Sequence, residues 1–353
     1  MPLTTFHALF VGWRAHIPVA LLTAGLNAGC GVHYVVSSAA YQAELLTSGE
    51  PVEAVLAGGA LSVGEEQRLR LFAEVKAFGA RIGLSATHNY DRYAVRWHRR
   101  IWNLSAAPPL SLAPRTWWFP IVGKVPYLGF FTDEAVGAWR TRLEGEGQEV
   151  HVREVGAYST LGWFRDPVLP AMLRWNEPRI AETVCHELAH ATLWIPGSVS
   201  FNESFASVVG EAAGDRFLVE KYGPDSAVVR AARDANHDSD VFTGLLVALA
   251  RELEAVYGGA GTEPERLAAK AALLAAFPDR VAAADLRDPE SWVRYARAQT
   301  WNNARLSQFR TYNTGHAAFL AILDRHHGDL AAFIEDIRAR TCGARDPFAT
   351  LGP

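Results

Sequence analysis

Apolar residues in the first third of the chain recur at helical spacing and predict three helices. These helices cover residues 33–46, 64–84 and 90–104. In the second helix an apolar residue stands at every third position, as expected when one side of a helix is buried: Leu69, Phe72, Val75 and Phe78. The turn-forming sequence Ser48-Gly49-Glu50-Pro51 indicates where the first helix ends.

The middle of the chain has a different pattern, in which strands and loops prevail. Five prolines and the run Trp117-Trp118-Phe119 indicate a loop that could lie over the rest of the protein. Thr132 has the residue type expected at the start of a helix. The predicted elements are a loop or lid (106–126), a strand (125–131), a helix (132–143), a half-buried strand with alternating valines (148–155) and a strand or turn (156–164).

From residue 178 to the C-terminus the pattern is almost wholly helical. Strands that gather ahead of a helical half are typical of an α+β fold. The sequence therefore predicts an α+β protein with a small β-sheet followed by a predominantly helical C-terminal half.

Composition supports a folded protein and disfavours some partners. The chain has 353 residues, of which 49% are hydrophobic and 20% charged, as in globular proteins with a sizeable core. The net charge is −4, so no global basic surface attracts nucleic acid. We therefore expect no nucleic-acid partner.

The N-terminus resembles an export signal. Arg14 and His16 precede an apolar run over residues 17–26, which is too short to cross a bilayer but suits the core of a signal peptide. Cys30 follows small residues, as the lipidated cysteine of a bacterial lipoprotein does. We expect a lipoprotein of the bacterial cell envelope, attached to the membrane through Cys30 and facing the periplasm. The alternative is an uncleaved hydrophobic helix on a cytoplasmic protein.

Three cysteines are too few for a disulfide framework. Cys185 lies in a predicted helix beside His186, where we expect a small buried residue and no bridge.

The segment His186-Glu187-Leu188-Ala189-His190 has the spacing of a metal site. Asn176 can cap the helix that carries it, and Pro178 fits the first turn of that helix. Histidines four residues apart leave a helix on the same side, so His186 and His190 can bind one zinc ion. Glu187 then stands beside the metal, where a carboxylate can accept a proton from zinc-bound water.

A third ligand is expected from the next helix, which begins near Ser200. Glu203 in its first turn can reach the metal, because a short connection makes the two helices antiparallel neighbours. Two histidines and one glutamate leave the fourth position open, as in catalytic zinc sites. Alternatively, Glu203 forms a capping box with Ser200, and Glu211 is the ligand or orients a histidine.

Two stretches resemble the gluzincin metallopeptidases. They are His186-Glu187-Leu188-Ala189-His190 and Phe201-Asn202-Glu203-Ser204-Phe205-Ala206. The aminopeptidase N family has a similar Asn-Glu-x-Phe-Ala sequence at the start of its second helix. The spacing differs, because here Glu203 follows His190 by only thirteen residues, and the Gly-Ala-Met-Glu-Asn motif of that family is absent.

From Gly29 to the C-terminus the chain resembles a family of bacterial lipoprotein zinc aminopeptidases. The landmarks besides the zinc segment are Gly29-Cys30, Trp102-Asn103-Leu104-Ser105, Trp117-Trp118-Phe119-Pro120-Ile121-Val122-Gly123, Tyr127-Leu128-Gly129, Ala157-Tyr158-Ser159-Thr160-Leu161-Gly162-Trp163-Phe164 and Asn302-Asn303-Ala304-Arg305-Leu306. The resemblance implies a zincin-like fold and peptide hydrolysis with one zinc ion.

We therefore expect the chain to consist of an N-terminal signal or anchor and one metallopeptidase domain. The signal or anchor covers residues 1–29 and the domain covers residues 30–353. Within the domain we distinguish a mostly helical lead-in (30–110), a catalytic core (111–225) and a helical half (226–353).

Several roles in peptide hydrolysis stay open at the level of sequence. Tyr158 or Tyr312 could stabilise the oxyanion, and Asn302 and Asn303 could line the site or cap a helix. The carboxylates that could bind the amine of a substrate are Asp133, Glu134, Asp166 and Glu211. The aromatic run from Trp117 could wall the cleft. An endopeptidase, or a zinc-binding envelope protein without hydrolysis, is the alternative to an aminopeptidase.

Overall fold

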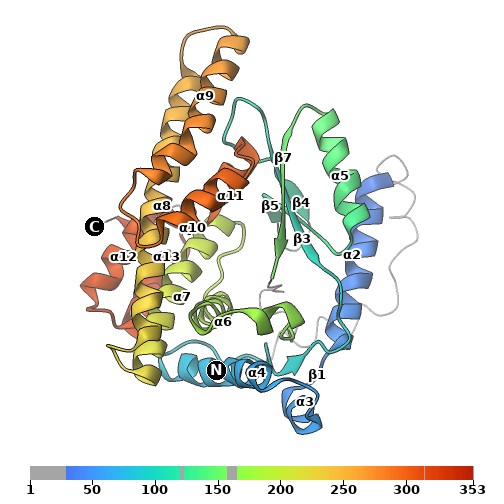
Figure 1. Cartoon of the computed structure of the whole chain (residues 1–353), viewed down its shortest axis with the longest axis vertical. Helices are drawn as coiled ribbons and strands as arrows, with labels where there is room; N and C mark the ends of the chain where they lie inside the picture. The colour runs from blue at the N-terminus through green and yellow to red at the C-terminus, as the bar shows by residue number, and fades with distance from the viewer. Residues whose placement is uncertain (1–28, 120–122, 157–164, 314, 353) are drawn as a thin grey trace. The chain divides into compact units, whose positions relative to one another are not determined.

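The computed structural model describes residues 29–119, 123–156, 165–313 and 315–352 (Figure 1). The chain divides into two compact units, residues 1–44 and 45–353, and helix α2 (Gly29–Ser48) contains the boundary. Within the described residues, none of the helices is apolar over a length that would cross a bilayer. The predicted signal and the side chain of Cys30 lie outside the described part.

The second unit is a mixed α+β structure with small antiparallel sheets. Its central sheet has the strand order β6-β3-β7. In this sheet β3 (Ile101–Ala107) pairs with β7 (Glu149–Val155) over its whole length, from Ile101 opposite Val155 to Ala107 opposite Glu149, and with β6 (Leu128–Phe130) on its other edge. Two further pairs are short: β1 (Glu50–Pro51) with β2 (Arg92–Tyr93), and β4 (Trp117–Phe119) with β5 (Gly123–Val125).

The predicted helix over residues 90–104 is wrong, because this segment forms β2 and β3. Strand β3 is buried at almost every position, since α11 (Asn303–Asn313) and α5 (Asp133–Gly145) both pack against it. A strand covered on both faces has no alternation of polar and apolar residues, so its sequence resembles that of a buried helix.

The predicted loop over residues 106–126 is also wrong in part. Strand β3 continues to Ala107, and β4 and β5 form a hairpin that begins at the aromatic run. Trp118 in this hairpin is 66% exposed. The prolines of this segment indicated an irregular loop, and the pattern of polar and apolar residues did not reveal the exposed hairpin.

The other helical predictions are confirmed. Helix α4 (Val63–Arg81) begins with a capping box between Ser62 and Glu65, and α5 is capped by the Thr132 hydroxyl, which accepts a hydrogen bond from the amide of Ala135 at 3.2 Å. Helix α3 (Val52–Gly58) precedes α4. The C-terminal half consists of helices, as predicted: α6 (Glu177–Thr192), α7 (Val199–Tyr222), α8 (Ala227–Gly258), α9 (Glu263–Ala282), α10 (Pro289–Ala298), α11, α12 (His316–Arg325) and α13 (Leu330–Thr341), with short 3-10 turns at Pro170–Arg174 and Phe348–Leu351.

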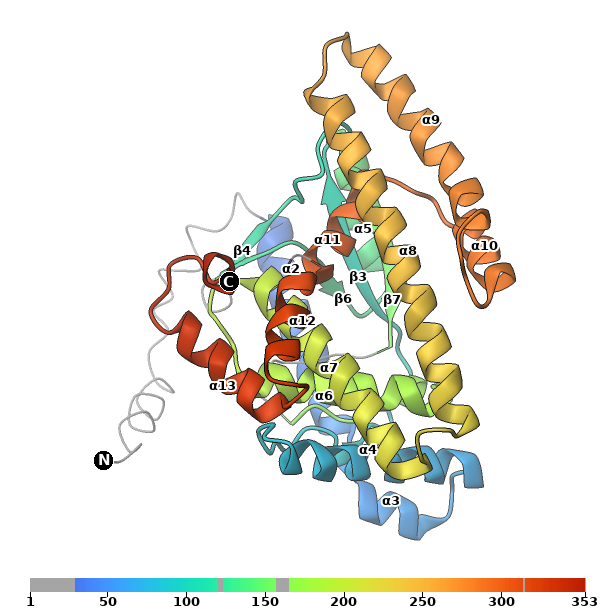
Figure 2. The same ribbon diagram turned by 90° about the vertical axis from the view of Figure 1, so that its left-hand side faces the viewer.

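The helical half has two apolar clusters. Helices α8 and α9 form a long hairpin (Figures 1 and 2), and Phe242, Leu249 and Phe277 lie in its apolar cluster. Helices α12 and α13 pack on α7, where the ring of Phe205 stacks on that of Phe333 at 5.9 Å. Helix α7 is therefore held on several sides.

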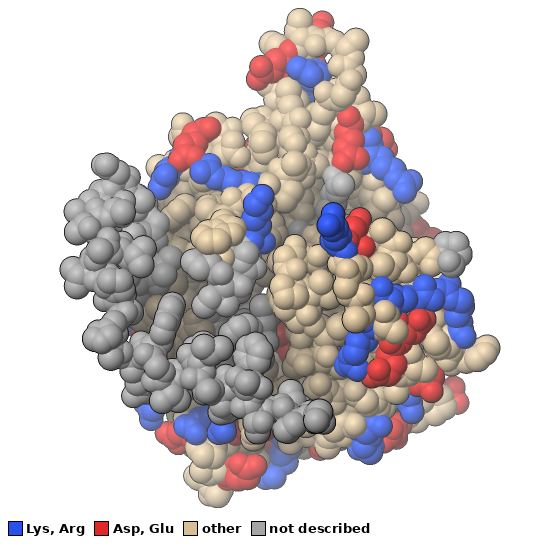
Figure 3. Space-filling model, turned by 180° about the vertical axis from the view of Figure 1, so that it is seen from behind, with Lys and Arg blue, Asp and Glu red and all other residues tan. Residues whose placement is uncertain are grey.

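Charged side chains of both signs are mixed on the surface. On the face shown in Figure 3, lysines and arginines lie next to aspartates and glutamates and do not form a field of one sign. This mixture agrees with the composition, in which 34 lysines and arginines nearly balance 38 aspartates and glutamates.

Helices α6 and α7 pack antiparallel and very close together. A Cβ atom at Gly210 of α7 would lie 2.9 Å from the carbonyl oxygen of Glu182 and 3.0 Å from the Cβ of His186, both on α6. At Gly214 it would lie 3.2 Å from the Cα of Glu182. Only glycine fits these positions at the observed separation of the helices.

We expect the substitution Gly210→Val to destabilise the protein by about 1–3 kcal/mol, because the added side chain must push the two helices apart. Gly244→Val is the matched control, since nothing lies within 4 Å of an added Cβ there. This control should be neutral or slightly stabilising, because glycine is a poor helix former. Denaturant unfolding measures both variants. Equal stability of the two would contradict the close packing.

Candidate active site

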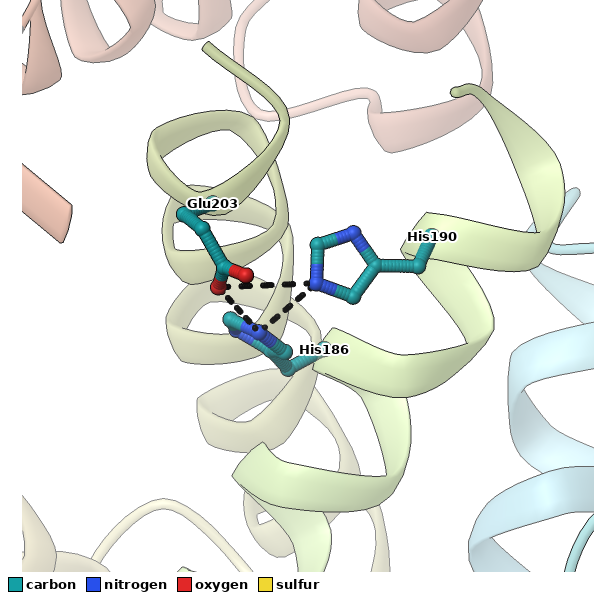
Figure 4. A group of neighbouring side chains, drawn as sticks. All are labelled: His186, His190 and Glu203. Atoms are coloured by element: carbon teal, nitrogen blue, oxygen red, sulfur yellow. Dashed lines mark hydrogen bonds and ion pairs between the residues drawn. The ribbon is translucent and has the colours of Figure 1, made fainter. Parts of the chain in front are cut away.

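The two histidines of α6 and Glu203 of α7 meet at one point (Figure 4). The Nε2 atoms of His186 and His190 lie 3.1 Å apart, and the Oε2 atom of Glu203 lies 3.4 Å from the first and 3.6 Å from the second. Two ligand atoms bound at 2.0–2.1 Å to a tetrahedral zinc ion are about 3.3 Å apart. The three atoms therefore lie close enough together to hold one metal ion.

Local sequence explains how α6 presents its histidines. The side chain of Asn176 caps the helix by accepting a hydrogen bond from the amide of Arg179 at 3.0 Å. The apolar side of α6 (Ile180, Val184 and Leu188) is buried, and α6 packs against α4. The histidines project from a different side of α6, towards α7. Cys185 is buried and has no disulfide partner, as predicted.

The connection between α6 and α7 is fixed by Asn202. Its side chain accepts a hydrogen bond from the amide of Ile195 at 2.9 Å and donates one to the carbonyl of the same residue at 2.8 Å. Asn202, the residue before Glu203, thereby ties the start of α7 to the connecting loop. Sequence reasoning missed this role, although asparagine is a common residue for such backbone contacts.

The capping box that was the alternative role of Glu203 is wrong, and Glu211 is not part of the group of three. Ser198, not Ser200, occupies the N-cap position of α7, and its side chain makes no cap hydrogen bond. The Glu203 carboxylate faces the histidines instead. Glu211 lies two turns further along, where its Oε2 atom is 3.2 Å from Nε2 of His316 and away from the group of three.

The imidazoles and carboxylates of the site shift one another's pKa values. Burial alone would raise the pKa of Glu203, but His190 and His186 lower it far below its usual value. Burial alone would lower the pKa of His186, but its hydrogen bond to Glu203 and the charges of Glu187, Glu203 and Glu182 raise it. Several carboxylates thus surround two imidazoles in a place with little solvent.

Two buried polar atoms at this site have no hydrogen-bond partner in the described part of the chain. They are the Oε2 atom of Glu187 and the Nδ1 atom of His190. Leaving a buried polar atom unpaired costs about 1–3 kcal/mol. Glu187 is not part of the group of three, so its carboxylate stands beside that group with one oxygen uncommitted.

A cleft of about 480 Å³ contains the site. Helix α6 forms one wall, and β3, β7 and Trp175 form the opposite wall. Charged residues other than Glu187 and the group of three are present on both walls: Arg153, Glu154, Arg179 and Glu182. The cleft is therefore large enough for a short segment of peptide.

None of the acidic residues that the sequence suggested for binding an amine is in the described lining of the cleft. Asp133 bonds to Arg100 and to the indole of Trp102. Asp166 is buried, and neither it nor Glu134 lines the cleft. The cleft instead offers Glu154 and Glu182, which sequence reasoning missed. The signal for Glu182 was its place one helical turn before His186, on the same side of α6.

The other residues that were considered have the following positions. Tyr158 lies outside the described residues, and so does the side chain of Tyr312. Asn302 caps α11, because its side chain accepts a hydrogen bond from the amide of Arg305, and it also donates to the carbonyl of Val150 in β7. The described lining of the cleft does not include the aromatic run from Trp117, but it includes Tyr127.

Comparison with protein families gives one match. The model of a family described as "Putative aminopeptidase" matches residues 33–343. The chain belongs to this aminopeptidase family. No curated protein and no solved structure matches it. The family match covers the group of three, both walls of the cleft and most of the helical half, and it supports a peptidase activity for this aminopeptidase family member.

We expect zinc to stabilise this aminopeptidase family member against thermal unfolding. A metal at one hundred times its dissociation constant contributes about 2.7 kcal/mol when it binds only the folded state. His186→Ala and Glu203→Ala should lose this response and the bound metal, whereas His98→Ala, at an exposed histidine, should keep both. Thermal unfolding with zinc or with a chelator, together with elemental analysis, tests this expectation. An undiminished zinc response of His186→Ala would contradict it.

Proposed function

We propose that the protein is a zinc-dependent aminopeptidase with a zincin-like site. The observation that carries the proposal is the spacing of 3.1–3.6 Å between the ligand atoms of His186, His190 and Glu203. Two imidazoles and one carboxylate are ligands that zinc accepts, and three protein ligands leave a position for water. The unpaired carboxylate oxygen of Glu187 supports catalysis rather than metal storage.

The residues of the chain divide the work of hydrolysis. Zinc, when bound, supplies an activated water and polarises the carbonyl of the substrate. Glu187 takes the proton of this water and transfers it to the departing amine. Burial of His190 and Glu203, which are 3% and 5% exposed, keeps water away from the rear of the site and strengthens its electrostatic interactions.

Strand β7 is suited to hold the backbone of a substrate. Among the described strands it pairs only with β3, and its C-terminal residues Arg153, Glu154 and Val155 line the cleft. A peptide in extended conformation can add to the edge of a strand. This arrangement places the peptide between β7 and α6, beside Glu187.

Glu182 is our candidate for binding the free amine of the substrate. Its side chain is open to the cleft and lies one turn, about 6 Å, before His186 on α6. The walls of the cleft raise the pKa of this carboxyl, and the charge of Glu211 raises it further. A substrate ammonium group would relieve this repulsion between the two carboxylates.

We expect Glu187→Gln to lower kcat by a factor of about 10²–10⁴, because the general base is removed. Zinc content should stay unchanged, since Glu187 is not in the group of ligands. Glu220→Gln is the matched control on an exposed part of α7. Peptide hydrolysis and elemental analysis are measured on the same samples. If the wild-type zinc protein cleaves no peptide, a binding role without hydrolysis replaces the proposal.

We expect Glu182→Gln to weaken the preference for peptides with a free N-terminus. Wild-type protein should cleave free peptides and spare their N-acetylated forms, because only the free amine carries a charge for Glu182. The ratio of kcat/KM for the two forms should fall at least about 10-fold in the variant, as expected for a lost hydrogen bond to a charged group. Equal cleavage of both forms by the wild type would make the protein an endopeptidase.

A further inference from the structure

A second cavity of about 650 Å³ adjoins the cleft that holds the metal site. The two cavities share Arg153 of β7 and Ser207 of α7. Helices α8, α10 and α11 form the remaining walls, and both views show these helices near α7 (Figures 1 and 2). This second cavity is called the aromatic pocket below.

Helix α7 and strand β7 both run from the cleft to the aromatic pocket, over a similar distance. On α7, Glu203, Ser207 and Glu211 follow at intervals of four residues, so they lie on one side of the helix and span about 12 Å. On β7, His151, Arg153 and Val155 lie on one face of the strand and span about 13 Å. The elements thus form one continuous groove, in which the aromatic pocket begins about one helical turn from the metal site.

The walls of the aromatic pocket are apolar and held in place by one another. The ring of Phe242 lies 4.6 Å from that of Trp292 and 5.9 Å from that of Tyr295, and Trp301 packs on Phe242 at 6.1 Å. Phe309 and two buried leucines complete the apolar part of the lining, and Arg153, Glu211 and Arg305 are its charged residues. Such a cavity has the size and the lining of a ligand pocket. Much of it is preformed, because the rings of Phe242, Trp292 and Trp301 belong to the apolar cluster of the helical half.

The polar residues at the junction fit the N-terminal end of a peptide. Glu182 belongs to the cleft and Glu211 to the aromatic pocket, and their charges act on each other. His151 stays neutral, because burial and the charges of Arg305 and Arg153 lower its pKa to about 4. Acidic groups that can hold an ammonium therefore lie at the mouth of an apolar pocket.

We propose that the aromatic pocket binds the side chain of the N-terminal residue, so that the enzyme prefers peptides that begin with a large apolar residue. This inference rests on the proposed aminopeptidase function. The N-terminal residue carries its side chain beside the scissile carbonyl, and the pocket opens one turn of α7 from the metal site. The amine then lies at Glu182, and Arg153 faces the backbone of the peptide.

The first test compares peptides that share the sequence X-Ala-Ala and differ only in X. We expect kcat/KM for phenylalanine and leucine to exceed that for alanine by about 10- to 100-fold, as burial of a large apolar side chain provides. Aspartate and lysine at X should be cleaved less well than alanine. Cleavage that is independent of X overturns the inference and leaves the proposed function intact.

A variant that fills the pocket supplies the second test. Thr243 lines the aromatic pocket from α8 and is only half-buried, so Thr243→Phe adds a ring to the cavity without removing a core side chain. The variant should lose the preference for phenylalanine, so that it cleaves Phe-Ala-Ala no faster than Ala-Ala-Ala. Gly244→Phe places the same ring at a neighbouring position with open space around it and should retain the preference. An unchanged preference in Thr243→Phe overturns the inference.

Binding without hydrolysis separates the inference from the proposed function. Calorimetric titration of the Glu187→Gln protein should show tighter binding of Phe-Ala-Ala than of Ala-Ala-Ala, and addition of Thr243→Phe should abolish the difference. If the wild type hydrolyses no peptide, the proposed function fails, and this titration still decides whether the pocket recognises an apolar N-terminal residue. Equal binding of the two peptides overturns the inference.

Discussion

The close antiparallel contact between α6 and α7 is the constraint on which the rest of the site depends. His186 and His190 stand on one helix and Glu203 on the other, so the spacing of their ligand atoms is set by the distance between the helix axes. Gly210 and Gly214 permit that distance. Asn202 fixes the turn between the helices, and α12 and α13 support α7 from behind.

The same contact gathers negative charge in a confined place. Four carboxylates, those of Glu182, Glu187, Glu203 and Glu211, lie along the two helices, and that of Glu203 is buried, where an isolated charge is costly. The protein compensates part of this cost with imidazoles and with Arg179 and His316 nearby. A metal ion at one end of the row and a substrate ammonium at the other would compensate more. The electrostatic arrangement is thus consistent with a peptide that binds with its N-terminus towards Glu182.

Helix α7 also connects the metal site to the helical half of the protein. Glu203 faces the histidines, Ser207 borders both cavities, and Glu211 lies in the aromatic pocket. Strand β7 runs along the opposite side of the groove and is held to α11 by Asn302. The long α8–α9 hairpin therefore has a local role, because its apolar cluster supplies the rigid aromatic wall.

The sequence by itself determined which side chains form the candidate metal site, because helical periodicity places His186 and His190 on one side and a short connection brings Glu203 to them. It misassigned residues 90–104, since burial of β3 by helices on both faces hides the strand period. Only the tertiary structure decided the opposite wall of the cleft and the aromatic pocket. Their residues, such as Arg153, Ser207, Phe242 and Trp292, are far apart along the chain, and no local pattern records that the packing of β7, α7, α8 and α10 brings them together.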